Sequence, residues 1–212
     1  MPNSTYAHPD LLASTSWLAS QLGDRHLKIV DARGPEEYSE AHIPGALLLP
    51  TGAFRSTGKI PGICTANEFC ATAGGLGITA SDVVVCYDAA GPAAARAWWA
   101  FTHFGHREVR FLNGGIRQWL AAGHPTNSQM PSIKRATYHV GRRDDSLVCS
   151  LPQAIAAVDD GSVLFWDVRT EGEFSGATPR DNPSDRAGHL PGAVHLEWTE
   201  LVESDSGLFK TV

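Results

Sequence analysis

Cysteine thiols have the greatest capacity for chemistry in this sequence, because a thiolate is both a nucleophile and a metal ligand. The chain contains four of them, at Cys64, Cys70, Cys86 and Cys149. No two stand in a C-x-x-C pair, and their spacings form no regular framework. The pattern predicts reduced thiols rather than disulfides, which is typical of a cytoplasmic protein.

Histidine is the second candidate, as an acid-base group or a metal ligand. His42 lies in the motif H-I-P-G-A, and His189 lies in the motif H-L-P-G-A. Neither belongs to an H-x-x-x-H pair or has a cysteine nearby, so we predict no metal site and expect no cofactor. The predicted role of each ring is a hydrogen bond that fixes the turn after a short helix.

Both histidines belong to a stretch that occurs twice, first at 31–46 and again at 167–193. The copies match at an offset of 136 residues, and the H-x-P-G-A motifs match at an offset of 147. The matching side chains are Asp31 with Asp167, Arg33 with Arg169, Glu37 with Glu173 and Tyr38 with Phe174. Two similar domains in tandem are therefore predicted, the second with an insertion before its H-L-P-G-A motif.

Strands and helices alternate around the first copy. A helix capped by Ser14 or Thr15 is expected to precede the apolar strand 27–31. Further strands are predicted at 46–49, 83–87 and 109–112, with a short helix that begins at Pro35 and helices at about 66–73, 93–104 and 116–121. Alternation at this pace predicts an α/β domain with a parallel sheet and helices on both faces.

The second copy is predicted to open a second α/β domain, with a helix after Ser150 and a strand at 163–167. Before it, the apolar pattern fails and proline, serine, asparagine and arginine accumulate. We therefore predict a first domain at 10–125, a linker at 126–146 and a second domain at 147–212.

The composition is that of an ordinary soluble globular protein, with 42% hydrophobic and 19% charged residues. The net charge of -6 argues against nucleic-acid binding, so an anionic substrate would need a local positive site. No stretch reaches the length of a membrane span, and the N-terminus lacks the pattern of a signal peptide. We expect no membrane partner and a cytoplasmic location.

Taken together, the motifs resemble those of the tandem-domain rhodaneses, the thiosulfate and 3-mercaptopyruvate sulfurtransferases. The resemblance covers about Asp10 to Val212 and is carried by D-A-R, E-Y and H-I-P-G-A, by VVVCYDAAGPAAARAWW and VRFLNGG, and by D-V-R, E-F and G-H-L-P-G-A. It implies an enzyme that moves sulfane sulfur from thiosulfate, or from 3-mercaptopyruvate, to cyanide or a thiol. It also implies a cysteine persulfide in the second domain and a non-catalytic first domain.

In the first domain, the position of the family's cysteine falls on Asp88, and a carboxylate cannot carry sulfane sulfur. A loop between a strand and a helix N-terminus presents amide N-H groups that favour a thiolate or an anion. We predict that Asp88 is instead a helix-capping or turn residue. Cys86 lies inside the apolar strand and is predicted to be buried and inert. Cys64, Cys70 and Cys149 match no position in the family's chemistry.

In the second domain, the family's cysteine would lie as far beyond H-L-P-G-A as Asp88 lies beyond H-I-P-G-A, which is near position 235, about 42 residues on. We therefore expect the second domain to be incomplete in this chain, with no catalytic residue among the 212 and the persulfide cysteine beyond Val212. A non-catalytic, rhodanese-like binding or regulatory module is the alternative. The oligomeric state stays open.

The resemblance also suggests residues that bind substrate. Arg180 and Arg186 lie where similar proteins carry arginines that reach the donor, and a guanidinium fits an oxyanion, although plain surface charge is the alternative. Glu173 stands where members that use mercaptopyruvate often carry arginine, which favours thiosulfate. His42 is the candidate for assisting a catalytic loop at a domain interface. Arg33 and Arg169 are predicted to pair with the aspartates two residues before them.

Overall fold

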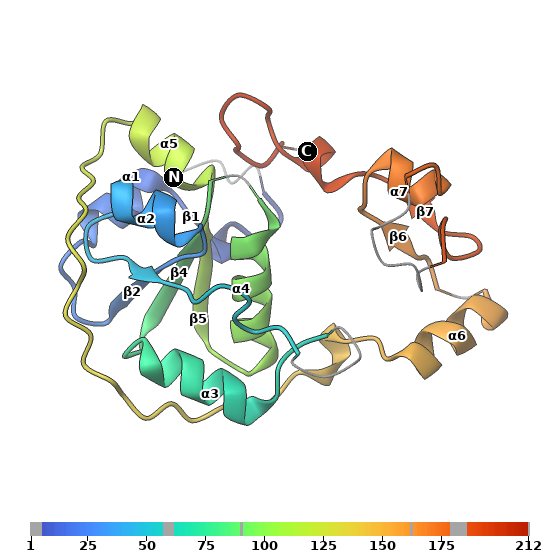
Figure 1. The fold of residues 1–212 in the computed structure, drawn as a ribbon, viewed down its shortest axis with the longest axis horizontal. Helices are drawn as coiled ribbons and strands as arrows, with labels where there is room; N and C mark the ends of the chain where they lie inside the picture. The colour runs from blue at the N-terminus through green and yellow to red at the C-terminus, as the bar shows by residue number, and fades with distance from the viewer. Residues whose placement is uncertain (1–5, 57–61, 90, 162, 179–185, 212) are drawn as a thin grey trace. The chain divides into compact units, whose positions relative to one another are not determined.

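The computed structural model describes residues 6–56, 62–89, 91–161, 163–178 and 186–211, which form two compact units (Figure 1). The first unit comprises Met1–Asp145 together with Ser206–Val212, and the second unit comprises Ser146–Asp205. No helix in the described ranges is long and apolar enough to cross a bilayer.

The first unit contains a five-stranded parallel sheet in the order β1-β5-β4-β2-β3. Its strands are β1 (Leu12–Ala13), β2 (Leu27–Asp31), β3 (Leu47–Leu48), β4 (Val83–Tyr87) and β5 (Glu108–Leu112). In the register, Asp31 lies opposite Tyr87 on one side and opposite Leu48 on the other. The predicted α/β fold with a parallel sheet is confirmed, and the carboxyl ends of β2 and β4 meet at one edge of the sheet.

Helices cover both faces of this sheet: α1 (Thr15–Ser20), α2 (Pro35–Glu40), α3 (Ala66–Gly75), α4 (Pro92–His103) and α5 (Gly115–Ala121). Successive side chains of a strand point to opposite faces, and β4 follows this rule. Val84 and Cys86 enter the core cluster beneath α3 and α4, whereas Val85 and Tyr87 enter the cluster beneath α1, α2 and α5. The run of apolar residues in β4 therefore serves two cores at once. A short 3-10 helix, η1 (Pro9–Leu11), precedes β1.

Two segments pack with the first unit where the sequence predicts otherwise. Residues up to Asp145, within the predicted linker, belong to the first unit, and Tyr138 is buried in its core. The backbone there lies so close to α3 that a Cβ on Gly74 would come within 2.4 Å of the Ala136 oxygen. The segment 206–211 was expected in the second domain, yet the Phe209 amide donates to Asn113 Oδ1 at 2.9 Å. In both segments, the contacts with the first unit are made by isolated residues that do not recur at the spacing of a helix or a strand. Hydrophobic periodicity in the sequence therefore does not reveal them.

The second unit contains helices α6 (Leu151–Asp160) and α7 (Glu171–Ser175) and a two-stranded parallel sheet of β6 (Trp166–Asp167) and β7 (Val194–His195). Two 3-10 helices lie at its ends, η2 (Asp145–Leu147) and η3 (Trp198–Leu201). The pairing of β6 with β7 repeats that of β2 with β3. None of the described residues in this unit is buried, and large apolar side chains are exposed, including Leu151, Ile155, Val163, Leu164, Trp166, Leu190 and Val194.

Candidate functional site

A buried ionic cluster lies at the carboxyl ends of β2 and β4. Arg33 binds the Asp31 carboxylate through Nη2 at 2.6 Å and Nε at 3.0 Å, and it also donates to the Ala41 carbonyl at 2.8 Å. The Tyr87 hydroxyl donates to the same carboxylate from the neighbouring strand. The side chain of Asp31 is fully buried and that of Arg33 is 8% exposed. The predicted pairing of Arg33 with Asp31 is confirmed.

The electrostatics of this cluster follow from its burial. Burial alone would lower the pKa of Arg33, but the hydrogen bond and the charge of Asp31 raise it overall. Burial, followed by the negative charge of Asp31, also raises the pKa of Tyr87 well above its ordinary value. The phenol therefore stays neutral and donates, while Asp31 and Arg33 form a charged pair. The cluster joins two strands and leaves no group free to act on a substrate.

Asp88 occupies the loop between β4 and α4, where an anion would otherwise meet the helix N-terminus. Its carboxylate accepts hydrogen bonds from the amides of Gly91 at 3.0 Å and Ala94 at 2.9 Å. Burial raises the pKa of Asp88, although these amides act in the opposite direction. Behind it, the Asp88 carbonyl accepts from the Ile116 amide at 2.9 Å, an approach that only a glycine at position 115 permits, because a Cβ there would lie 2.3 Å from that oxygen. The predicted capping role of Asp88 is confirmed.

Replacing Asp88 with alanine should therefore destabilise the first unit. The buried Ala94 amide and the part-buried Gly91 amide lose their acceptor. Loss of a helix cap costs about 1–2 kcal/mol of unfolding free energy. Urea unfolding followed by tryptophan fluorescence measures the loss. Asp88→Asn is the control. Its side-chain oxygen can still accept one of the two amide hydrogen bonds, so it should lose less unfolding free energy than Asp88→Ala. A more stable Asp88→Ala protein would show that burying the carboxylate costs more than its hydrogen bonds return.

None of the four cysteines belongs to the loop between β4 and α4. Cys86 is fully buried in β4, as predicted, and burial followed by the charge of Asp88 raises the pKa of its thiol. Burial, more than the charge of Glu68, raises the pKa of Cys64 to about 11. Cys70 is half-buried and Cys149 is exposed. Neither Cys64 nor Cys86 has the low pKa of a nucleophilic cysteine.

The two motif histidines adopt the same local arrangement. His42 Nδ1 lies 2.7 Å from the Tyr38 carbonyl, and its ring stacks on the Tyr38 ring at 3.8 Å. His189 Nδ1 lies 2.8 Å from the Phe174 carbonyl and stacks on that ring at the same distance. The predicted hydrogen bonds to the short helices are therefore confirmed. Within the described part of the chain, no three His, Cys, Asp or Glu side chains gather to hold a metal ion.

His42 makes one further contact, because its Nε2 lies 3.1 Å from the Gln129 carbonyl. The ring is fully buried and connects α2 with the segment 126–146, which the sequence predicts to be a linker. Both ring nitrogens thus face carbonyl acceptors, and a neutral imidazole can donate to only one of them. A role for His42 beside a catalytic loop stays a prediction.

The second unit repeats the ionic pair at its own strand end. Arg169 Nη2 lies 2.6 Å from Asp167 and 2.9 Å from the Gly188 carbonyl, which confirms the predicted pairing. Glu173 caps α7 by accepting from the Thr170 amide at 3.2 Å. Arg186 is exposed, and Arg180 lies outside the described residues. Sequence analysis did not single out His195, which takes the register position that Leu48 has in the first unit. Its Nε2 lies 2.7 Å from the Arg169 carbonyl.

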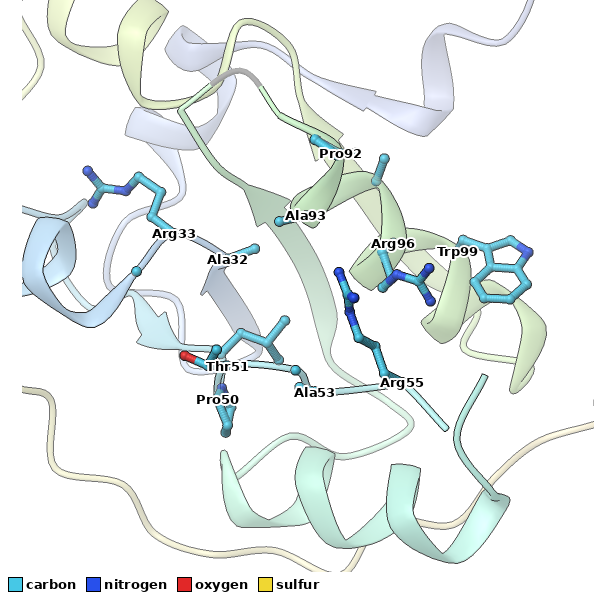
Figure 2. Close-up of a pocket in the computed structure, with 14 residues that line it drawn as sticks. Ala32, Arg33, Pro50, Thr51, Ala53, Arg55, Pro92, Ala93, Arg96 and Trp99 are labelled. Atoms are coloured by element: carbon cyan, nitrogen blue, oxygen red, sulfur yellow. The ribbon is translucent and has the colours of Figure 1, made fainter. Parts of the chain in front are cut away.

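A pocket of about 570 Å³ opens in the first unit beside the start of α4 (Figure 2). Its walls are the 49–55 segment, the end of β2 and the first turns of α4. Arg55 and Arg96 extend into it, whereas Arg33 points away toward Asp31. Sequence analysis did not single out Arg55 and Arg96 as a pair, because they are 41 positions apart in the chain.

Comparisons with known proteins agree with this architecture. The Rhodanese-like domain family matches residues 14–122. A thiosulfate sulfurtransferase from Corynebacterium glutamicum is 33% identical over 97% of this chain and 71% of its own length. The sulfur carrier protein TtuD from Thermus thermophilus is 33% identical over 97% of this chain and 75% of its own length.

A solved structure also matches. The crystal structure of SseA from Escherichia coli, a 3-mercaptopyruvate sulfotransferase, is 26% identical with a TM-score of 0.80. The alignment covers 95% of this chain and 79% of SseA. The parallel α/β architecture, the matched domain and the similarity over nearly the whole chain lead to one conclusion: this chain belongs to the rhodanese family.

Proposed function

We propose that this chain is the larger part of a sulfurtransferase that takes sulfane sulfur from thiosulfate, or less readily from 3-mercaptopyruvate, and passes it to cyanide or a thiol. Curated relatives with sulfurtransferase names support the general activity. One observation carries the proposal that the first unit is non-catalytic. The Asp88 carboxylate accepts hydrogen bonds from the Gly91 and Ala94 amides at the start of α4. That unit supports the reaction without carrying sulfur.

In this proposal, the nucleophile is a cysteine of the second rhodanese-like domain, encoded beyond Val212. Its thiolate attacks the outer sulfur of thiosulfate, a new S-S bond forms, and sulfite leaves with the electrons of the old S-S bond. The acceptor then takes the outer sulfur and returns the thiolate. Support comes from the second unit, where β6 has only β7 as a strand partner among the described residues. In the first unit, the equivalent β2 lies between β3 and β4.

Arg186 and Arg180 are proposed to bind the anionic donor, and Glu173 favours thiosulfate over a 2-oxo acid. Arg186 is exposed and is therefore accessible to a small anion. His42 is proposed to be the residue of the first domain that supports the catalytic loop. A cytoplasmic location, with no nucleic-acid partner and no cofactor, completes the proposal.

Thiocyanate formation from thiosulfate and cyanide tests the proposal. The 212-residue chain should show no turnover, whereas the chain extended by its own following codons should be active. Replacing the new cysteine with serine in the extended chain is the control and should abolish thiocyanate formation. Turnover by the 212-residue chain, or an inactive extended chain with a well-folded second domain, would contradict the proposed mechanism.

A non-catalytic rhodanese-like binding or regulatory module is the second candidate. The hydrogen bonds from the Gly91 and Ala94 amides to Asp88 favour it, because the carboxylate takes the place of an anion there and the described residues of that loop include no nucleophile. The same assay separates the two proposals, since a module of this kind would stay inactive after extension.

A further inference from the structure

The pocket beside α4 has a strongly positive lining. Among the described residues that line it, three are arginines and none is acidic. Arg33 is committed to Asp31, so Arg55 and Arg96 supply the charge available to a ligand. Neither of these two side chains has a carboxylate or other hydrogen-bond partner within the described part of the chain. Although the chain has a net charge of -6, this pocket therefore has a local excess of positive charge.

The core holds the two arginines in this arrangement. Phe54 precedes Arg55 and has a φ of 63°, a left-handed conformation that is costly for a residue with a side chain. Its ring is buried against Phe69 and against Phe101 of α4, at 5.0 and 5.5 Å. Because Arg96 also lies on α4, the packing of Phe54 on Phe101 brings the Arg55 segment against the helix that carries Arg96. The guanidinium pair is therefore positioned by buried aromatic contacts.

Bringing these cations together is unfavourable in the absence of an anion. Burial, and then the positive charge of Arg55, lowers the pKa of Arg96. The amides at the start of α4 cannot account for anion binding here, because Asp88 already accepts from Gly91 and Ala94. Attraction for an anion must come from the two guanidinium groups, whose planar forks match oxyanion geometry.

We propose that Arg55 and Arg96 form a binding site in the first unit for a compact oxoanion with two negative charges, such as thiosulfate, sulfate or phosphate. A dianion neutralises both cations, and the pocket of about 570 Å³ has room for a small anion and its water. All residues that line this site belong to the first unit. Its occupation requires no turnover, so binding and catalysis can fail independently.

Isothermal titration calorimetry on the 212-residue chain, at constant ionic strength in chloride buffer, tests the site. Thiosulfate, sulfate and phosphate are titrated separately, with pyruvate as the singly charged comparison. We expect saturable binding of at least one dianion. The variants Arg55→Gln and Arg96→Gln should each weaken that binding about tenfold or more, because each removes charge-assisted hydrogen bonds.

Arg107→Gln is the matched control, since Arg107 is an exposed arginine of the same unit outside the pocket. It should leave the affinity unchanged. Arg96→Lys keeps the positive charge but loses the planar guanidinium group, so it should give an intermediate affinity. A urea unfolding curve equal to that of the unaltered chain verifies that each variant is folded. The relative affinities of the three dianions then distinguish a sulfur oxoanion from phosphate. Absence of saturable binding, an affinity in both glutamine variants equal to that of the unaltered chain, or pyruvate binding as tightly as the dianions would overturn the proposal.

Discussion

Replacing Arg33 with methionine is expected to lower the free energy of unfolding of the first unit by about 3–5 kcal/mol, the cost of leaving a buried charge without its partner. Asp31 is fully buried, and Arg33 supplies the only positive charge that contacts it among the described residues. Methionine preserves much of the apolar stem, so the loss reports on the ion pair rather than on a cavity. Urea unfolding at neutral pH measures it.

The double variant Asp31→Asn/Arg33→Met should recover much of this loss, because the uncompensated charge is removed with its partner. Arg169→Met provides a matched control in the second unit. There the side chains of Arg169 and Asp167 are 29% and 13% exposed, so the same bidentate pair is partly solvated. This variant should change the main unfolding transition by no more than about 0.5 kcal/mol. A similar loss for Arg33→Met and Arg169→Met would contradict the assignment of the effect to burial.

The second large effect is expected in hydrogen exchange. The Leu49 amide donates to the Asp31 carbonyl at 2.8 Å, and the equivalent Leu196 amide donates to the Asp167 carbonyl at 3.1 Å. Leu49 is 9% exposed beside a packed core, whereas Leu196 is 37% exposed in a unit with no buried residue among those described. Exchange through local opening should therefore be about a hundredfold or more faster at Leu196, after correction for intrinsic rates.

Deuterium uptake measured by NMR or by peptide mass spectrometry resolves the two amides. The β4 amides serve as the internal reference for opening of the first core. If Leu49 and Leu196 show equal protection, the second unit is as stable as the first, despite its exposed apolar side chains. The extended chain of the activity assay offers a further comparison, in which slower exchange at Leu196 would indicate that added strands complete the sheet.

Much of the local structure could be predicted from short-range spacing. An apolar strand must alternate its side chains between two faces, so Cys86 could be predicted to be buried and unreactive. Each strand-end aspartate lies two positions before its arginine, a distance that a single turn closes in either unit. Asp88 at the entrance of a helix could be expected to cap it, since short acidic side chains reach the first amides. These features depend on contacts within a few residues along the chain.

Which distant side chains meet depends on the tertiary structure. The strand order and register place the Tyr87 hydroxyl on Asp31, from a strand that lies more than fifty residues later, and the Asp31 carboxylate is fully buried. The packing of Phe54 on Phe101 brings Arg55 to Arg96, and Phe209 returns to Asn113. Such encounters follow from how whole elements pack. The apolar pattern of an element indicates which face is buried, but burial of apolar surface is non-directional, so the pattern does not specify which distant element covers that face. The family, the α/β architecture and the capping role of Asp88 could be predicted from the residues and their spacing, whereas the arginine pocket is visible only in the folded structure.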